Sequence, residues 1–240
     1  MDKRLLWTSL IASSVIYPLY SPVMSQDQRS WSAFKQPHSR PLPPPQVSSE
    51  KWVLNPIDAF VLAALNQSKI KPAPAIDRMD WIRRVTYNLT GLPPLPEDVV
   101  AFAEDVQPDE IAYQTVVDRL LSSPRYGERW ARHWLDVARY GESNGFEYNE
   151  PRRNAWPYRD WIIDSLNADM PYDEFARMQI AGDILLPGRE GAAAVGFLVA
   201  GTHNTVLGAS PLMKNQARQD ELGEIVGTVT QAFLGLTVQC

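Results

Sequence analysis

Apolar residues recur every three or four positions along most of this chain, which is the spacing that places them on one face of an α-helix. The pattern predicts helices that begin near Asn55, Asp77, Pro96, Pro108, Pro124, Trp156, Pro171, Gly191 and Asn215. The strict alternation of apolar and polar residues that is typical of strands is nearly absent. We therefore expect a mainly α fold, a compact and irregular multi-helix domain with short connections.

The predicted helices carry their own start and stop signals. Asn55 precedes Pro56 and an acidic Asp58, an order that suits an N-cap, a first-turn proline and the positive end of the helix dipole. Gly91, followed by two prolines within three residues, marks the end of the next helix. These local signals support the helix boundaries independently of the apolar pattern.

Two helices have apolar stripes that we expect to be buried. The stripe of the helix from Pro124 to Gly141 consists of Tyr126, Trp130, Trp134, Val137 and Ala138. The stripe of the last predicted helix, 215–233, consists of Leu222, Ile225, Val226, Val229 and Phe233. Together with Trp161, these residues predict a core rich in tryptophan.

Residues 1–25 have the pattern of an export signal. Lys3 and Arg4 precede a run without charged side chains that reaches Gln26, and small residues favour cleavage after Ser25. The alternative is an uncleaved membrane anchor, which two prolines inside the run disfavour. We expect an exported protein, periplasmic or extracellular, with no stable membrane span after cleavage.

A proline-rich linker is predicted between the signal and the helical domain. Residues 26–54 contain five prolines, which favour an extended path over a helix. The helical domain would then span 55–240, a length that suits a single hydrophobic core. The chain ends on an apolar run without a helix cap, so we expect this domain to be cut short at its C-terminus.

Charge and cysteine content exclude some functions. The formal net charge is −5, and loss of Asp2, Lys3 and Arg4 with the signal would make it more negative by one. Nucleic-acid binding relies on clustered basic residues, so we do not expect it here. Cys240 is the only cysteine, so the chain has no internal disulfide.

The segment 141–160 is the least ordinary stretch of the sequence, because carboxylates, amides, arginines and aromatic residues alternate in it. Its candidate ligand or metal residues are Glu142, Asn144, Glu147, Arg152, Arg153, Trp156, Tyr158, Arg159 and Asp160. Carboxylate and amide oxygens suit a hard cation, whereas aromatic faces with arginines suit a sugar or an acidic group. In the alternative interpretation, these charges pair with one another and with helix ends to fasten a long loop.

Two histidines are candidates for chemistry. His203 lies in a predicted loop and could act as a distal haem ligand or as a base. His133 lies next to the tryptophan stripe of its helix, and we interpret it as structural. No serine elbow, phosphate-binding glycine loop, zinc motif or paired-cysteine site is present in the sequence, and whether the chain is an enzyme stays open.

Five sequence blocks follow one another between Asn55 and Pro187 in the order of a known family. They read NPIDAFVLAAL, IRRVTYNLTGLPPLPEDVVAF, SPRYGERWARHWLDVARYGESNGFE, RRNAWPYRDWIIDSLNADMPYDEF and QIAGDILLP. The chain from Asn55 onward therefore resembles the planctomycetal cytochrome-c-associated domain of unknown function. The match is looser after Pro187.

The resemblance implies a large exported protein in which this region precedes a second domain. In relatives, the block similar to 233–240 continues into a Cys-x-x-Cys-His motif, so the resemblance makes Cys240 its first cysteine. That motif attaches haem c, with its histidine as an axial iron ligand. A haem could thus be bound only by a longer form of the chain, and the linker 26–54 differs from relatives with an upstream cytochrome module because it contains no cysteine.

Three hypotheses about function follow. The chain is the helical platform of a larger c-type-haem or redox-associated protein, or it is a carbohydrate-related enzyme or binding module that uses the 142–160 loop, or it is a scaffold without chemistry. Its expected partners are the C-terminal domain of the same protein or other exported proteins.

Overall fold

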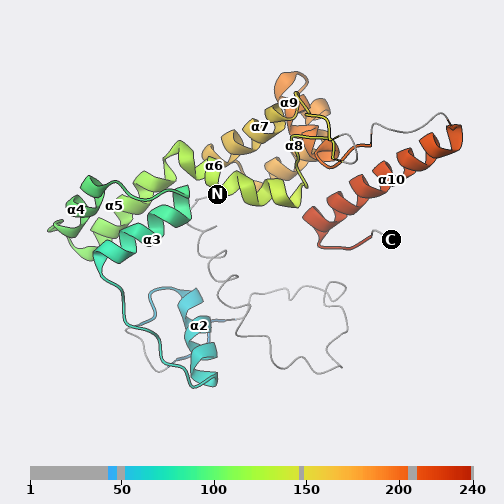
Figure 1. Ribbon diagram of the computed structural model, residues 1–240. Helices are drawn as coiled ribbons and strands as arrows, with labels where there is room; N and C mark the ends of the chain where they lie inside the picture. Colours follow the sequence, from blue (N-terminus) through green and yellow to red (C-terminus); the bar gives the residue numbers. More distant parts are fainter. Residues whose placement is uncertain (1–42, 48–51, 146–148, 205–209, 239–240) are drawn as a thin grey trace. The chain divides into compact units, whose positions relative to one another are not determined.

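The computed structural model describes residues 43–47, 52–145, 149–204 and 210–238 (Figure 1). It confirms a mainly α fold. The described residues fall into two units, one that ends at Ile76 and one that begins at Asp77. The predicted signal peptide and most of the predicted linker lie outside the described residues.

The described residues of the first unit include the helix α2 (Pro56–Gln67). Its N-terminus is capped as the sequence predicts. The Asn55 side chain accepts hydrogen bonds from the backbone N–H groups of Ile57 and Asp58, and the Asp58 carboxylate accepts from the Asn55 N–H at 3.1 Å. This reciprocal capping box satisfies backbone donors that would otherwise lack partners at a helix start.

The second unit is an array of helices joined mostly by short connections. In chain order these are α3 (Arg78–Thr90), α4 (Pro96–Ala103), α5 (Asp109–Leu121), α6 (Pro124–Val137), α7 (Trp156–Asn167), α8 (Tyr172–Leu185), α9 (Arg189–Ala194), the 3₁₀ helix η3 (Val195–Val199), α10 (Pro211–Val229) and the π-helical turn η4 (Thr230–Leu234). Within the described residues the β structure is limited to an isolated bridge between Ser143 and Pro151.

Helices α3, α4 and α5 pack through aromatic residues. The Trp81 ring lies 4.4 Å from Tyr113 and 5.4 Å from Phe102, measured between ring centroids. Arg78, at the start of α3, donates to the carbonyl oxygens of Phe102 and Asp105. The guanidinium therefore ties the end of α4 to α3 while its charge stays at the surface.

The main core lies where α6, α7, α8 and η3 meet. Trp161 stacks on Phe175 at 5.4 Å, and Trp134 contacts Phe175, edge to face, at 5.0 Å. Gly127 of α6 lies so close to α7 that an added Cβ would stand 2.5 Å from the carbonyl oxygen of Ile163. The predicted core rich in tryptophan is thus confirmed for the α6–α8 region.

One polar side chain is fully buried in that core. The Gln179 carbonyl oxygen accepts hydrogen bonds from Trp134 Nε1 at 2.7 Å and from the Tyr158 hydroxyl at 2.8 Å. Its amide nitrogen donates to the Phe175 carbonyl at 3.2 Å. Burial raises the pKa of Tyr158, so its hydroxyl stays a donor to Gln179.

The structure departs from the predicted stripes at three positions. Val137 is 45% exposed, and Leu222 and Val226 of α10 are 39% and 50% exposed, although the sequence pattern predicted burial for all three. In α10 the neighbouring row that holds Ile225 and Val229 faces inward instead. Sequence spacing defines a stripe, but the packing partner decides which of its rows is covered.

Some helix boundaries also differ from the prediction. The helix predicted at 171–180 continues to Leu185 across a kink at Ala181. The helix predicted from Gly191 begins at Arg189 and tightens into η3, and α10 begins at Pro211, four residues before Asn215. Terminal turns of helices depend on local packing, which explains why the interiors were predicted better than the ends.

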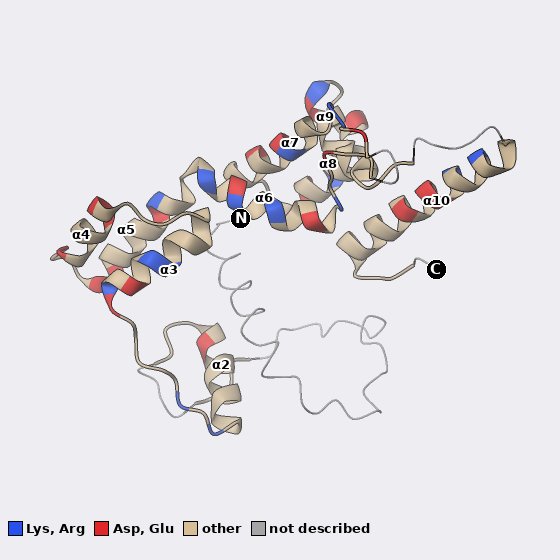
Figure 2. Cartoon of the chain, viewed as in Figure 1, with Lys and Arg blue, Asp and Glu red and all other residues tan. Residues whose placement is uncertain are grey.

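The charged residues of the helices are mixed in sign. Figure 2 shows Lys and Arg interspersed with Asp and Glu along α3, α6 and α7, and in α10 the basic residues precede the acidic ones. None of the helices in the described ranges combines the length and apolar character that crossing a bilayer requires.

Candidate functional site

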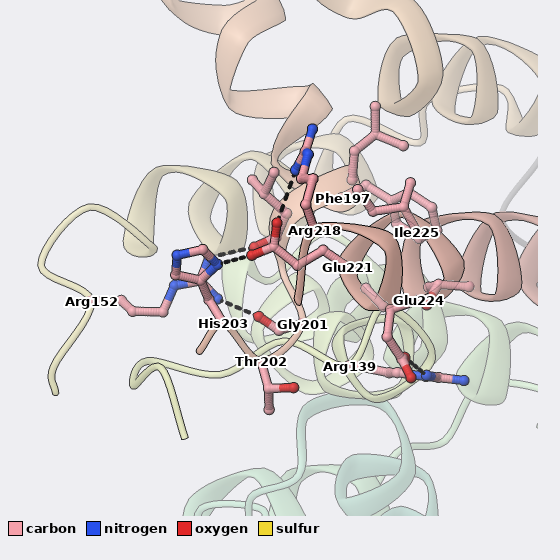
Figure 3. A pocket seen from close by; sticks show the side chains of 14 residues that line it. Arg139, Arg152, Phe197, Gly201, Thr202, His203, Arg218, Glu221, Glu224 and Ile225 are labelled. Atoms are coloured by element: carbon pink, nitrogen blue, oxygen red, sulfur yellow. Dashed lines mark hydrogen bonds and ion pairs between the residues drawn. The ribbon is translucent and has the colours of Figure 1, made fainter. Parts of the chain in front are cut away.

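A cavity of about 410 Å³ lies between the end of α6, the segment 197–203 and α10 (Figure 3). It combines charged side chains with an apolar wall. Its lining residues are Ala138, Arg139, Arg152, Phe197, Leu198, Val199, Gly201, Thr202, His203, Arg218, Glu221, Glu224, Ile225 and Thr228. Pockets of this size with a few convergent polar groups are the usual location of ligand sites.

Arg152 holds one wall of the cavity in place. Its Nη1 donates to the carbonyl oxygens of Ala200 at 2.9 Å and Gly201 at 2.8 Å, and its Nη2 donates to the carbonyl of Val199. Three consecutive carbonyls, from Val199 at the end of η3 to Gly201, thus accept from one guanidinium. The fork of Arg suits this task because its donors are rigidly spaced.

The backbone of the predicted loop adds to this attachment. The Asn144 carbonyl accepts from the His203 N–H at 3.0 Å, and the Gly141 N–H donates to the Ala200 carbonyl at 3.3 Å. Within the loop, Arg152 N donates to the Glu142 carbonyl at 2.7 Å. The segments around residues 142 and 200 are therefore fastened to each other along their length.

His203, Glu221 and Arg218 form a linked group at the cavity. His203 Nδ1 faces Glu221 Oε1, and Arg218 Nη1 donates to the other carboxylate oxygen at 2.9 Å (Figure 3). The hydrogen bond from Arg218, together with the nearby imidazole, lowers the pKa of Glu221. The carboxylate is therefore ionised and orients the imidazole, whose side chain is 51% exposed.

Arg139 and Glu224 form the second charged pair of the cavity. Arg139 follows α6 in the left-handed conformation, with φ of 56°, and its Nη1 pairs with Glu224 of α10. Its Nη2 donates to Gln231 at 3.3 Å. The end of α6 is thereby linked to two successive parts of the C-terminal helix.

Other candidate residues of the 142–160 loop form a separate cluster. Arg159 Nη1 donates to Glu142 at 2.6 Å, and Arg159 Nη2 lies 3.0 Å from Asp160. The Tyr140 hydroxyl also donates to Glu142, at 3.2 Å. Burial, together with the Glu142 carboxylate, raises the pKa of Tyr140 to about 12. These groups do not line the cavity.

The remaining predicted residues are divided among surface, core and undescribed positions. Trp156 is 43% exposed, with the Arg189 guanidinium 5.6 Å from its ring centroid, and Arg153 is exposed. Tyr158 is buried in the core. Glu147 and Cys240 lie outside the described residues, so the structure places neither of them.

The two candidate histidines differ in their surroundings. His203 lines the cavity, whereas His133 is exposed on α6 with its ring centroid 5.2 Å from that of Trp130. Within the described residues, no three His, Cys, Asp or Glu side chains gather in a way that could hold a metal ion. The structure thus brings together two of the predicted residues, Arg152 and His203, at one cavity.

The sequence interpretation missed four charged residues of the cavity, namely Arg139, Arg218, Glu221 and Glu224. Three of them, Arg218, Glu221 and Glu224, belong to α10. They recur at intervals of three residues, which places neighbouring members of the series near one another on the helix surface. That polar stripe was a signal, although nothing in it pointed to residues 139, 152 and 203. Arg139 gave no signal, because a helix end in this conformation usually carries glycine.

Chemically, the cavity offers cationic and anionic groups beside an apolar surface. The oriented imidazole of His203 keeps its second nitrogen for another partner, as a donor when protonated and as an acceptor when neutral. The guanidinium of Arg152 stands at the same cavity. This combination suits recognition of a small charged molecule with an apolar part.

The family comparison found a match to the model PSCyt2, described as a protein of unknown function (DUF1549), over residues 56–240. No curated protein and no solved structure gave a match. The family match covers the five sequence blocks except their first residue, Asn55, and it covers residues 77–240 of the second unit, including every residue of the cavity. The chain therefore belongs to the PSCyt2 family, the planctomycete cytochrome-c-associated domain of unknown function.

Proposed function

We propose that the chain is the helical platform of a larger exported protein associated with c-type haem or with redox partners, and that it positions other groups rather than catalysing a reaction. One observation carries the proposal. Arg152, the central arginine of the 142–160 loop, donates to three consecutive backbone carbonyls of residues 199–201. An arginine used in this way fixes backbone, which is the work of a scaffold.

The neighbouring charges support the same interpretation. Arg159 engages both Glu142 and Asp160, so these carboxylates are paired on the protein surface. Removing any one of these groups would loosen a loop rather than delete a reactive atom. The loop and the segment 199–203 then present α10 and the cavity in a fixed arrangement.

His203 is the described residue whose imidazole could hold haem iron. Its Nδ1 is occupied by Glu221, and a carboxylate on one ring nitrogen is how proteins orient histidines that bind metals through the other. When bound, haem c would supply electron transfer. In this proposal the His203 imidazole would hold the iron, Glu221 would fix the tautomer of that imidazole, and Cys240 would provide one thioether of the attachment.

The proposal is tested with a form of the chain extended beyond Cys240 and exported in a host that matures c-type cytochromes. We expect a Soret band and a denatured mass greater by one haem. We also expect the mature N-terminus at Gln26, as the predicted signal cleavage requires. A secreted, folded and colourless protein would contradict the haem association, and recovery with the intact leader in the cytosol would contradict export.

A second candidate function is carbohydrate binding, which the position of Trp156 favours. Its half-exposed ring lies at the start of α7, with Arg159 and Asp160 one helical turn further along the same helix. An exposed aromatic face beside polar groups is a common way to hold a sugar ring. A glycan array would test this, with binding lost in Trp156→Ala and kept in Tyr172→Ala, a matched change of another exposed aromatic residue. Equal binding by both variants would exclude this surface.

A further inference from the structure

We propose that the cavity between α10 and the segment 197–203 binds a small organic monoanion, a carboxylate with an apolar body. Arg152 and His203 receive the negative charge, and the apolar body packs on the partly exposed Leu198 and Ile225. The proposal concerns the chain without haem, because His203 Nε2 cannot hold both haem iron and an anion. Figure 3 shows Arg152 and His203 toward one end of the cavity, Arg139 and Glu224 toward the other, and Glu221 between them.

The balance of charge favours an anion. Three arginines and two glutamates line the cavity. Arg218 pairs with Glu221, and Arg139 pairs with Glu224. The partners of Arg152 among the described residues are backbone carbonyls, which carry no formal charge. In the described part of the chain, the positive charge of Arg152 is therefore solvated and hydrogen-bonded but not neutralised.

Arg152 also retains hydrogen-bonding capacity. A guanidinium has five N–H donors, and the three bonds to the backbone use three of them. The two that remain suit a carboxylate, which accepts bonds from forked donors. The arginine can thus hold the segment 199–201 and a ligand at the same time.

His203 provides a second donor when its imidazole is protonated. Because its Nδ1 is paired with Glu221, its Nε2 is the ring nitrogen that can reach a ligand. The side chain is 51% exposed, so a ligand can reach it without opening the core. Glu221 keeps the imidazole in one orientation and so reduces the entropy that binding would cost.

The apolar wall of the cavity favours a ligand whose uncharged part is apolar. Leu198 and Ile225 are partly exposed and give the cavity an aliphatic surface, whereas the lining residues Phe197 and Ala138 are buried. An inorganic anion would leave this wall against water, whereas an organic body would cover it and gain hydrophobic free energy. The volume of about 410 Å³ suits a small molecule.

The two glutamates limit the charge of the ligand. Glu221 and Glu224 face the same cavity, so a second negative charge on a ligand would be repelled at short range. The site therefore selects a monocarboxylate over phosphate esters or dicarboxylates. Because α10 supplies Glu221, Glu224 and Ile225 while the other wall comes from the α6 end and residues 197–203, a bound ligand joins the two walls.

Calorimetric titration of the full chain with benzoate and hexanoate tests the proposal, with benzyl alcohol, hexanol and inorganic phosphate as comparison probes. We expect the two carboxylates to bind and to raise the unfolding temperature, and the alcohols and phosphate to bind at least tenfold more weakly. Equal binding of carboxylates and their alcohols, tighter binding of phosphate, or no binding of either carboxylate at millimolar concentration would overturn the proposal.

Variants locate the binding. His203→Gln and Arg152→Gln should each weaken benzoate binding at least tenfold, while Arg153→Gln, an exposed neighbour outside the cavity, should leave it unchanged. Circular dichroism checks that each variant is folded. If Arg152→Gln fails to fold, His203→Gln and Ile225→Ser decide the question, because neither removes a bond to the backbone of 199–201. Unchanged affinity in folded His203→Gln and Ile225→Ser would place binding elsewhere and contradict the proposal.

Discussion

At the scale of single residues, the ends of helices show where this chain accepts strain. Shortly after helices α2, α6 and α7 the chain has a non-glycine residue in the left-handed conformation, namely Lys69, Arg139 and Asp169. After α6, the Tyr140 N–H donates to Leu135 O at 2.9 Å and Arg139 N to Asp136 O at 3.1 Å. This is the hydrogen-bond pattern of a Schellman motif, in which glycine is the usual residue.

The strain at Arg139 predicts an order of stability among its variants. Arg139→Ala loses the pair with Glu224 and keeps the unfavourable φ, whereas Arg139→Gly loses the pair but adopts this φ without strain. We expect the alanine variant to be less stable than the glycine variant by roughly 1 kcal/mol. Urea unfolding of both variants measures this difference, and an alanine variant as stable as the glycine one would show that φ is not strained in solution.

Gly127 marks the closest approach of α6 to α7. A Cβ there would meet the Ile163 carbonyl and the Asn167 side chain at 2.5 to 2.7 Å. We expect Gly127→Ala to lower the free energy of unfolding by about 2 kcal/mol, because the two helices must separate. The matched change Gly223→Ala, in α10 with open space around the Cβ, should raise it by about 0.5 to 1 kcal/mol. Equal effects of the two changes in thermal unfolding would contradict this contact.

At the scale of elements, one buried glutamine links three helices. Gln179 of α8 accepts from Trp134 of α6 and from Tyr158 of α7. Two residues later, α8 kinks at Ala181, where φ is −143°. Gly182 then lies against Gly191 of α9, with its Cβ position 2.9 Å from the Gly191 carbonyl oxygen. The kink and these two glycines let α8 and α9 pack closely on the same core.

Removal of the Gln179 amide should leave polar groups without an acceptor. We expect Gln179→Leu to destabilise the fold by about 2 to 3 kcal/mol, because the Tyr158 hydroxyl stays buried while its acceptor is lost. Adding Tyr158→Phe in that background removes the hydroxyl donor and also the remaining acceptor of Trp134 Nε1, which donates to the Tyr158 hydroxyl at 3.2 Å, so the combined effect should differ from the sum of the two single effects. Urea unfolding of the single and double variants forms the test, and additive losses would show that the two groups are not coupled.

We expect the contribution of Glu221 to the free energy of unfolding to depend on pH. The pKa of this carboxyl is lowered in the folded protein by Arg218 and by His203, so its stabilisation is present above the unfolded pKa of about 4.3 and is lost as the pH falls through the folded pKa. We expect the difference in unfolding free energy between wild type and Glu221→Gln to shrink below about pH 4. Urea titrations between pH 3 and 7 measure this difference in unfolding free energy, and Glu190→Gln in α9 is the control. A difference between wild type and Glu221→Gln that is constant over this pH range would contradict the pairing.

At the scale of the whole molecule, the family match and the structural units do not coincide. The match begins at Pro56 and therefore includes α2, whereas the second unit begins at Asp77. The sequence interpretation placed the start of a single helical domain at residue 55. Sequence similarity follows inheritance along the chain, while the structural boundary follows contacts, and the two can separate where a segment makes few of them.

The sequence by itself determined the helices, because their signals are local. Asn55 caps α2, Gly91 ends α3, and prolines occupy the first turns of α4 and α6, as their positions in the sequence predicted. Each signal acts within one turn of its own residue, so no knowledge of distant contacts is needed. The family followed in the same way, from blocks of consecutive residues.

Only the tertiary structure decided the site. Arg139 and Glu224 are 85 residues apart, and Arg152 and Gly201 are 49 apart, so no local pattern places them together. The rows of α10 that face inward were likewise settled by the helices against which they pack. Contacts between distant residues depend on how the whole array closes, and the pattern along one chain records the faces of helices but not their partners.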